Sequence, residues 1–378
     1  MSELSYLEKL LDGVEVEWVT LGSMADIGTG SSNRQDESEN GIYPFYVRSK
    51  NILKSDTFEF DEVAIVIPGE GGIGDIFHYV EGKYALHQRA YRIRITTNAV
   101  DTKFLYYFMS SSFKQYILTK SVGATAISIR KPMLEGFKVP IPSPDNPEKS
   151  LAIQSEIVRI LDTFTALTAE LTAELNMRKK QYNYYRDQLL SFKEGEVEWK
   201  TLGEVAVIGT GNHDTQDAIE HGKYIFYARG REPLKLNVFD FDETAIITAG
   251  DGAGVGKVFH YAKGKYALHQ RAYRIVPNAF MNPRFVYHYI TAYFFTYIQK
   301  ASVSSSVTSL RRPMFLKFPI PVPPSEEQAR IVEILDKFDT LTNSITEGLP
   351  REIELRQKQY EYYRDLLFSF PKPETVSN

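Results

Sequence analysis

The strongest constraint on the fold of this chain is that its sequence repeats itself. The segment KYALHQRAYRI at residues 83–93 recurs without a change at 265–275. RKKQYNYYRDQLLSF at 178–192 returns as RQKQYEYYRDLLFSF at 356–370, with 11 of 15 positions identical. Matches of this length, spread over most of the 378 residues, predict two copies of one structural unit in tandem.

Each copy begins with a part that has the pattern of a globular domain. Short runs rich in β-forming residues, such as EVAIVIP at 62–68 and ETAIITA at 243–249, alternate with glycine-rich turns. Aromatic segments such as FLYYFMSSSFKQYIL at 104–118 follow and indicate helices. With 43% apolar residues, the chain can bury a core in each copy. The sequence therefore predicts two α+β domains.

A proline-rich hinge ends each globular part, and a long helix is predicted after it. The hinges contain Pro140, Pro142, Pro144 and Pro147 in the first copy and Pro319, Pro321, Pro323 and Pro324 in the second. Asn146 stands before Pro147 as an N-cap residue with proline at the first helical position. Ser325 with Gln328 has the pattern of a capping box.

Both predicted helices carry an apolar seam with coiled-coil spacing. In the first, nine of eleven seam positions are apolar: Ile157, Leu161, Phe164, Thr168, Leu171, Leu175, Arg178, Tyr182, Tyr185, Leu189 and Phe192. The second has Ile331, Leu335, Phe338, Thr342 and Ile345, then Ile353, Arg356, Tyr360, Tyr363, Leu367 and Phe370, with four extra residues around Gly348 to Pro350. We expect the helices to pair antiparallel as a coiled coil, with the two domains related by a pseudo-twofold axis.

The predicted architecture is α+β, with two globular domains separated by the two long antiparallel helices. The boundaries are 1–146 for the first domain, 147–194 for the first helix, 195–324 for the second domain, 325–370 for the second helix and 371–378 for a tail. The segment YLEKLL at 6–11 resembles the end of the helix that precedes the second EVEW. We therefore expect the N-terminal segment 1–13 to pack near the C-terminus.

The formal charge of −4 argues against nucleic-acid binding until the charge is counted by segment. Residues 82–134 hold nine Lys or Arg and one acid, Asp101, and residues 252–325 hold ten Lys or Arg and no acid. The two windows occupy equivalent places in the repeats. This pattern favours binding of a polyanion by each globular domain.

The residue types in the two windows suit double-stranded DNA. Amide, guanidinium and imidazole groups that can reach base edges are supplied by His87, Gln88, Arg89 and Arg92 and by His269, Gln270, Arg271 and Arg274. Hydroxyl and basic groups that can approach phosphate are supplied by Ser121, Thr125, Ser128, Arg130 and Lys131 and by Ser304, Ser305, Ser306, Arg311 and Arg312. The alternative is that some of these polar side chains only stabilise loops and do not contact DNA.

Several kinds of site are disfavoured by the sequence. The glycine-rich loops GEGGIG at 69–74 and GDGAGVG at 250–256 lack the following helix and acid of a dinucleotide fingerprint, so tight hairpins are favoured. Asp75, Glu81 and Lys83 resemble part of a metal nuclease site, but Lys263 replaces the glutamate in the second copy. His87 and His269 lack a paired nucleophile or carboxylate at recognisable spacing, and zero cysteines exclude thiolate chemistry. We expect no metal, no cofactor and no catalytic residue in this chain, and a cytoplasmic location.

The chain has two globular modules, each followed by a long helix, with LTAELTAEL at 167–175 and the shared RKKQY-type helix ending. In these features it resembles the specificity (S) subunit of type I restriction-modification enzymes. The resemblance implies a non-catalytic subunit that binds two methyltransferase (M) subunits and, in the full complex, restriction translocase (R) subunits. Each domain would read one half of a bipartite DNA target. S-adenosylmethionine and the methylation chemistry would belong to M, and this chain has no NPPY or DPPY tetrapeptide.

The same resemblance places the M-binding surface on the ends of the helices, at Tyr182, Tyr185, Arg186, Tyr360, Tyr363 and Arg364. The sequence departs from the family pattern because its two modules are unusually alike, which predicts a nearly palindromic target. The alternatives are a stand-alone nuclease acting on DNA and a coiled-coil scaffold that joins protein partners. The scaffold alternative leaves the basic windows unexplained.

Overall fold

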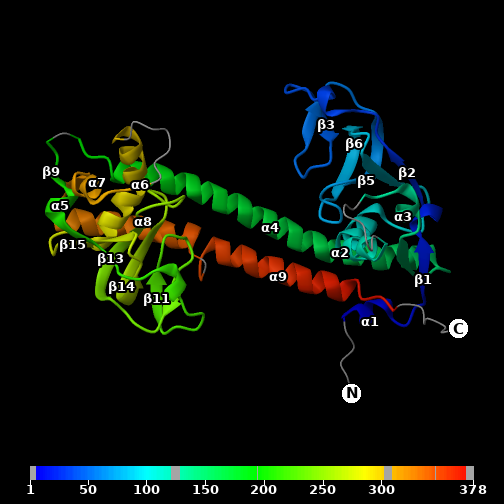
Figure 1. Ribbon diagram of the computed structural model, residues 1–378. Helices are drawn as coiled ribbons and strands as arrows, with labels where there is room; N and C mark the ends of the chain where they lie inside the picture. Colours follow the sequence, from blue (N-terminus) through cyan, green and yellow to red (C-terminus); the bar gives the residue numbers. More distant parts are fainter. Residues whose placement is uncertain (1–5, 121–127, 194, 302–308, 345, 372–378) are drawn as a thin grey trace, which may run out of the picture. The chain divides into compact units, whose positions relative to one another are not determined.

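The computed structural model describes residues 6–120, 128–193, 195–301, 309–344 and 346–371. The chain forms two compact units, one of Met1–Leu171 with Ile353–Asn378 and one of Thr172–Glu352. Each unit holds a sheet-rich domain, and the predicted α+β class is confirmed (Figure 1). The chain passes between the units in α4 (Pro147–Leu189) and in α9 (Leu349–Leu367).

The domain of unit 1 is built on a six-stranded sheet in the order β2-β7-β5-β6-β3-β4. Its elements are α1 (Tyr6–Leu11), β1 (Val16–Thr20), η1 (Leu21–Ser23), β2 (Ala25–Thr29), η2 (Arg34–Asp36), β3 (Tyr43–Tyr46), β4 (Leu53–Ser55), β5 (Phe60–Pro68), β6 (His78–Leu86), β7 (Ala90–Ile95), α2 (Thr102–Lys120), α3 (Lys131–Glu135) and β8 (Lys138–Pro142). β1 and β8 form a separate antiparallel pair. β3 lies parallel to β6, and the other neighbours are antiparallel.

The domain of unit 2 repeats this topology with the strand order β10-β15-β13-β14-β11-β12. Its elements are β9 (Glu198–Thr201), α5 (Leu202–Val205), β10 (Ala206–Thr210), η3 (Thr215–Asp217), β11 (Tyr224–Tyr227), β12 (Leu234–Leu236), β13 (Phe241–Ala249), β14 (Phe259–Leu268), β15 (Ala272–Pro277), α6 (Pro283–Ala301), α7 (Arg312–Leu316) and β16 (Pro319–Val322). The internal repeat of the sequence is therefore a repeat of topology.

Alternation along the central strands divides each sheet between two apolar clusters. In β5, Ile65 and Ile67 face the larger core, which holds the aromatic side of α2, whereas Val66 faces a smaller cluster with Tyr84. In β13, Ile246 and Ile247 divide in the same way. Because both faces are buried, the central strands are apolar runs, as the sequence indicated.

The apolar seam of the long helices packs inside each unit. In unit 1, Phe164 of α4 stacks on Tyr363 of α9, with ring centroids 5.3 Å apart. In unit 2, Tyr185 of α4 stacks on Phe338 of α8 (Ser325–Asn343) at 5.6 Å. The first helix begins at Pro147, and Asn146 Oδ1 accepts the Lys149 N–H at 3.1 Å, which confirms the predicted cap.

The second long helix differs from the prediction, because two helices, α8 and α9, replace one helix over 325–370. α8 ends at Asn343, and Gly348 adopts a left-handed φ of 81° just before α9. Pro350, in the first turn of α9, has no N–H to continue a helix from residues before it. The four extra residues of the second copy thus form the break, and Ile345 lies outside the described residues.

The predicted capping box at Ser325 is wrong, and Gln328 has another role. Ser325 is the first helical residue, and no side chain caps the helix at Pro324. Gln328 is buried; its Oε1 accepts the Asn282 N–H at 2.7 Å and its Nε2 donates to the Pro323 carbonyl at 2.9 Å. It therefore joins α8 to the segment before α6.

The equivalent glutamine in unit 1 makes the same kind of connection. Gln154 of α4 is buried; its Oε1 accepts the Asp101 N–H at 2.8 Å and its Nε2 donates to the Ala99 carbonyl at 3.0 Å. Each repeat thus uses one buried amide to fix a long helix to the backbone just before the aromatic helix of its domain.

The N-terminal and C-terminal segments share the core of unit 1. Leu7 and Leu11 of α1 are buried in the same cluster as Leu367 and Phe368. Trp18 Nε1 donates to the carbonyl of Pro371 at 2.8 Å. The segment just after α4 supplies the buried Leu190 and the partly buried Phe192 to the core of unit 2 in the corresponding way. Each domain is therefore completed by the end of a long helix.

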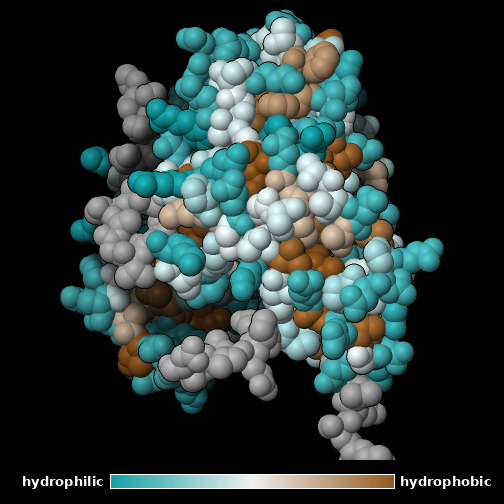
Figure 2. Space-filling model, turned by 90° about the vertical axis from the view of Figure 1, so that its right-hand side faces the viewer, coloured by the Kyte–Doolittle hydropathy of each residue, from teal (hydrophilic) through white to brown (hydrophobic). Residues whose placement is uncertain are grey.

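Hydrophilic side chains cover most of the face in Figure 2, and its hydrophobic side chains form separate small patches. Among the described residues, no helix is long and apolar enough to cross a membrane.

Replacement of Gln154 by leucine should destabilise unit 1. The substitution removes the partner of the Asp101 N–H and of the Ala99 carbonyl and places an apolar side chain against them, so we expect the free energy of unfolding to fall by roughly 2–4 kcal/mol. Urea unfolding of the full chain measures the change. Gln188→Leu, at an exposed position of the same helix, is the control and should leave stability nearly unchanged; equal effects of the two variants would contradict this role for Gln154.

Candidate nucleic-acid interface

The HQR sequence forms the same turn in both domains. Residues 87–89 join β6 to β7, and residues 269–271 join β14 to β15. The histidine Nδ1 accepts the backbone N–H two residues later, from Arg89 at 3.0 Å and from Arg271 at 2.9 Å. An accepting Nδ1 places the proton of the neutral ring on Nε2. The histidines thus shape the turn that displays the exposed glutamine and arginine.

The two histidine rings are buried and held neutral. His87 is 8% exposed and His269 is 1% exposed. Each ring stacks on a phenylalanine, Phe45 or Phe226. Burial, aided by nearby arginine charges, lowers the pKa of both histidines. The two histidines therefore support the turn and are not placed to make the predicted base contacts, because a buried ring cannot reach into a groove of DNA.

Three loops meet at the HQR turn because three strand ends lie together. Tyr46 at the end of β3 pairs with Leu86 at the end of β6, and Pro68 at the end of β5 pairs with Ala90 at the start of β7. Residues that follow β3 and β5 therefore lie beside the turn. The same pairings bring the ends of β11, β13 and β14 together in unit 2.

A carboxylate bridges two arginines at this meeting point in each domain. Arg89 donates to Glu70 Oε1 at 2.7 Å, and Arg48, which follows β3, bonds to the same oxygen. The hydrogen bond from Arg89, with that from Arg48, lowers the pKa of Glu70. The arrangement has two exposed guanidinium groups on one acid.

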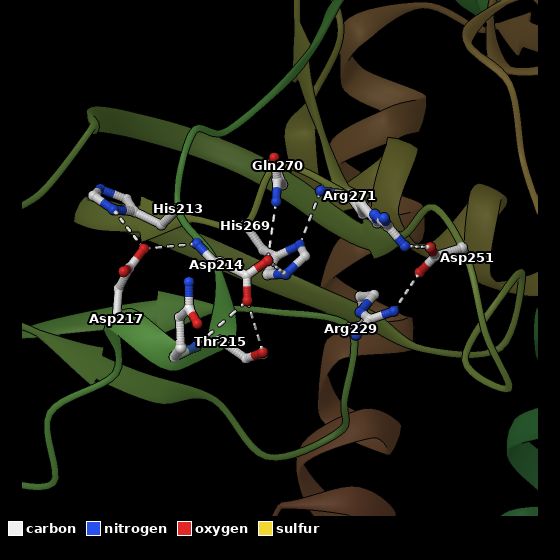
Figure 3. A network of polar contacts seen from close by, with 10 residues as sticks. His213, Asp214, Thr215, Asp217, Arg229, Asp251, His269, Gln270 and Arg271 are labelled. Atoms are coloured by element: carbon white, nitrogen blue, oxygen red, sulfur yellow. Dashed lines mark hydrogen bonds and ion pairs between the residues drawn. The ribbon is translucent and has the colours of Figure 1, made fainter.

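Unit 2 contains the same bridge with a shorter acid (Figure 3). Asp251 accepts from Arg229 at 2.9 Å and from Arg271 at 3.1 Å. Burial alone would raise the pKa of Asp251, but the hydrogen bonds from the two arginines outweigh it and the pKa is lowered. We call the Arg48–Glu70–Arg89 and Arg229–Asp251–Arg271 sets the arginine bridges.

The predicted phosphate-binding segments join the same loops. The Ile129 N–H donates to the Gly69 carbonyl at 2.8 Å, and the Gly69 N–H donates to the Arg89 carbonyl at 2.9 Å. Leu310, Gly250 and Arg271 repeat this chain of bonds in unit 2. Ser128 pairs with Glu70 and Ser309 with Asp251 as isolated β-bridges. The basic segments after them are therefore anchored beside the arginine bridges.

The basic residues at these anchors are exposed. Arg130, Lys131, Arg311 and Arg312 all lie at the surface, and Lys131 is 3.8 Å from Glu135. Arg130, Arg311 and Arg312 form no ion pair with any residue in the described ranges. The remaining predicted hydroxyl residues, Ser121, Thr125, Ser304, Ser305 and Ser306, lie outside the described residues.

A hollow lies beside each arginine bridge. In unit 1 it measures about 230 Å³ and is lined by Arg34, Val47, Arg48, Ser49, Glu70, Gly71 and His87. In unit 2 it measures about 580 Å³ and its lining includes Arg229, Asp251, Gly252 and Lys257. Glycine residues in the predicted hairpin loops adopt positive φ, 66° at Gly71 and 83° at Gly252. Each loop is followed by a strand, β6 or β14, after at most a short turn, as a hairpin requires. In a dinucleotide fingerprint a helix would follow the loop.

Arg92 and Arg274 stabilise the sheets, and their predicted contact with DNA is not supported by their placement. The Arg92 side chain is 14% exposed; it bonds to Asp26 at 2.8 Å and to Glu62 at 3.2 Å and lies over the Phe60 ring. Arg274 bonds to Glu243 at 2.8 Å and lies over Phe241. The alternation of ALHQRAYRI could not distinguish these arginines from Arg89 and Arg271.

Acids from outside the two basic windows compensate much of their charge. Glu70, Asp162 and Asp251 pair with Arg89, Lys103 and Arg271 respectively. Arg284 of α6 bonds to Asp336 and Asp339 of α8 at 2.7 and 2.8 Å. The windows therefore do not form uniformly positive surfaces, although a count along the sequence suggested this.

Sequence reasoning missed four members of the arginine bridges, Arg48, Glu70, Arg229 and Asp251. Arg48 corresponds to Arg229, and Glu70 corresponds to Asp251, in the two repeats. That correspondence was the signal in the sequence from which these residues could have been found. The geometry does not support the nuclease alternative, because Asp75, a residue of the suspected metal site, is paired with Lys114 at 2.7 Å. No three His, Cys, Asp or Glu side chains in the described part of the chain are grouped to hold a metal ion.

The predicted partner-binding residues are divided between the seam and the surface. Burial raises the pKa of Tyr182 and Tyr360 to about 12, and both pack against domain cores. Arg186 and Arg364 bond to the neighbouring Asp187 and Asp365. Tyr185 and Tyr363 stack on the facing helix and stay partly exposed.

The sequence argument missed the most exposed tyrosines of the helices. Tyr184 is 62% exposed and Tyr362 is 65% exposed. They lie next to Tyr185 and Tyr363 and contact them edge to face. Their equal exposure at equivalent places marks a repeated aromatic surface.

Comparison of Arg274 with Arg271 tests the division between structural and accessible arginines. Arg274→Leu should lower the free energy of unfolding by roughly 2–4 kcal/mol, because it removes the ion-pair partner of the Glu243 carboxylate in the sheet and leaves only the Tyr266 hydroxyl bonded to it. Arg271→Leu, at an exposed site, should change stability by about 0.5 kcal/mol or less. Urea unfolding measures both. A larger loss for Arg271→Leu than for Arg274→Leu would reverse the assignment.

Comparison with known proteins agrees with the repeated architecture. The type I restriction modification DNA specificity domain matches residues 13–178 and again 194–355. The specificity subunit of the type I restriction enzyme EcoR124I/EcoR124II from Escherichia coli is 42% identical over 420 residues, with 100% of both chains covered. The specificity subunit of EcoprrI from Escherichia coli is 37% identical over 92% of this chain and 93% of its own length.

A solved structure supports the fold. The S subunit of a type I restriction-modification system from M. genitalium superposes with a TM-score of 0.69 at 18% identity and covers 96% of this chain and 98% of its own. The two matched domains and the full-length relatives show that the chain belongs to the family of type I restriction-modification DNA specificity subunits.

Proposed function

We propose that this chain is the DNA-reading subunit of a type I restriction-modification complex, in which each globular domain reads one half of a bipartite, nearly palindromic target. The observation that carries the proposal is the occurrence of the same HQR turn and arginine bridge at equivalent loops of both domains. Like sites on like domains suit like half-sites. A catalytic role is not needed for this function.

The chemistry of the exposed groups fits duplex DNA. Arginine makes bidentate bonds to guanine and glutamine to adenine in the major groove. Arg89 with Gln88, and Arg271 with Gln270, are neighbours on an exposed turn. Arg130, Arg311 and Arg312 lie at the starts of α3 and α7, beside the anchored loops, where they would hold phosphates and fix the register. In the arginine bridges, the acid keeps the guanidinium groups positioned before DNA arrives.

We infer that the helices bind the catalytic partners. Tyr184 and Tyr362 are exposed at equivalent places, and large exposed aromatic side chains are enriched at protein interfaces. Two equivalent surfaces suit two methyltransferase (M) subunits, which would bring S-adenosylmethionine and the reaction. Restriction translocase (R) subunits would join in the full complex. Because the substrate is DNA of the cell or entering it, we propose that the complex works in the cytoplasm.

Half-site identity provides the direct test of the proposed function. We expect methylation directed by this chain with its methyltransferase partner to fall on a target whose two halves are nearly the same sequence on opposite strands. Arg271→Ala should weaken methylation at one half-site sequence at least tenfold, because a bidentate guanine contact provides discrimination of that order. Methylation-site sequencing in cells measures both, and two unrelated half-sites would contradict the proposal.

The length of α4 should set the number of unspecified bases between the half-sites. The chain passes from unit 1 to unit 2 between Leu171 and Thr172, inside the repeated TAEL segments of a continuous helix. One further TAEL adds roughly 6 Å and rotates the helix end by about 40°. We expect the spacer to lengthen by one or two base pairs. Methylation-site sequencing of the insertion variant that returned an unchanged spacer would exclude this role.

A further inference from the structure

The two HQR turns are identical in sequence, but their glutamines face different partners. Gln88 Nε2 donates to the amide oxygen of Asn33. Gln270 Nε2 donates to the carboxylate Oδ2 of Asp214 at 3.0 Å. Asn33 and Asp214 hold the same place, just before η2 and η3. The domains therefore differ at the group that orients an exposed glutamine.

The carboxylate of Asp214 is fixed by several donors (Figure 3). Its Oδ1 accepts from the Thr215 hydroxyl at 3.2 Å and from the Gln216 N–H at 3.5 Å. The Asp214 N–H in turn donates to Asp217 Oδ2 at 2.8 Å. These bonds hold the start of η3 in place, so Asp214 presents Oδ2 to the glutamine in a defined position.

A second donor points to the same oxygen. His269 Nε2 is 3.8 Å from Asp214 Oδ2, and this buried atom has no hydrogen-bond partner among the described residues. Because His269 Nδ1 accepts from the turn, Nε2 carries the proton and faces a negative group. The hydrogen bond from Gln270 also lowers the pKa of Asp214. The residue at this place in unit 2 is thus an ionised acceptor.

An acceptor without a proton allows only one orientation of the Gln270 amide. A carboxylate cannot donate, so the glutamine must turn its NH₂ group toward Asp214 and its Oε1 away from it. One N–H of that NH₂ group stays available beside Oε1. An acceptor beside a donor is the pattern that pairs with N6–H and N7 of adenine in the major groove.

Asparagine does not impose this restriction on Gln88. Its side chain has both an oxygen acceptor and an NH₂ donor, so the Asn33–Gln88 pair can also form with both amides reversed. The reversed pair gives up the capping-box contact that the Asn33 side chain accepts from the backbone N–H of Asp36. In the reversed pair, Asn33 donates to Gln88 Oε1 and the Gln88 NH₂ group faces outward. Two outward N–H donors suit O6 and N7 of guanine.

We propose that Asp214 restricts Gln270 to adenine, whereas Asn33 lets Gln88 accept either purine. The two half-sites then differ in stringency at corresponding positions: one position is strictly adenine and the other is adenine or guanine. Asp214 and Asn33 act through the glutamines as positioning residues. This inference rests on the proposed function, since it names the base that each turn reads.

Reciprocal substitution tests the inference in the complete complex with the methyltransferase partner. Methylation-site sequencing of the unaltered chain should return adenine alone in one half-site and both purines at the corresponding position of the other. Asp214→Asn should raise methylation of the guanine-containing form of the strict half-site roughly tenfold. Asn33→Asp should make the degenerate half-site strict by a similar factor. A shift in purine preference is a readout that a structural role alone would not produce.

Asp242→Asn is the matched control, because it makes the same chemical change at an exposed strand position of the same domain; it should leave the target unchanged. Strict and degenerate positions that stay as they are in both reciprocal variants would overturn the inference. If Asp214→Asn prevents assembly, the Asn33→Asp result decides alone. Failure of the proposed function has a different signature, since the unaltered chain would then direct no sequence-specific methylation.

Discussion

The structure depends on a buried amide that fixes each long helix to its domain. Gln154 and Gln328 each satisfy a backbone N–H and a carbonyl in the segment before the aromatic helix. A buried backbone group without a partner costs about as much as a lost hydrogen bond, so these glutamines constrain the direction in which the helix leaves. Apolar packing of Ile157 and Ile331 then holds the helix there. A rigid exit is what a helix needs if its length is to determine a distance between two reading sites.

Charge in this chain is organised in pairs whose exposure differs. Arg274 and Arg271 stand three residues apart in the same repeated segment, but one lies in the sheet with Glu243 and the other on the turn with Asp251. An ion pair at the surface contributes little stability, so the arginine bridge can exchange its acid for phosphate or a base at little cost. The pair in the sheet cannot, because it would leave Glu243 without its partner.

Much of the fold followed from the sequence because the repeat and the strand patterns are strong local signals. The α+β domains, the hairpin loops and the start of α4 at Pro147 were all readable from residue type and spacing. The four extra residues near Gly348 were visible as an interruption of the apolar seam, but the sequence analysis still predicted one helix where the structure has α8 and α9. The capping box at Ser325 failed because Gln328 is used in a contact with residue 282, far away in sequence, that no local pattern contains. Arg92 was mistaken for a DNA contact for the same reason: Asp26 and Glu62 approach it only in the folded sheet.

The candidate site shows why residue identity alone is a weak guide to specificity. The segment KYALHQRAYRI is the same in both domains, so any difference in what they read must come from the residues around it. Asn33 and Asp214, Ser32 and His213, and Glu70 and Asp251 are such differences. Each changes the donors and acceptors around the turn, although the exposed residues of the turn itself stay the same. The oxygen and the NH₂ group of a side-chain amide have nearly the same shape, but one accepts hydrogen bonds and the other donates them. One neighbouring atom can therefore decide which of the two groups faces outward. Duplicated domains can therefore diverge in the groups around the turn while they keep the sequence of the turn itself.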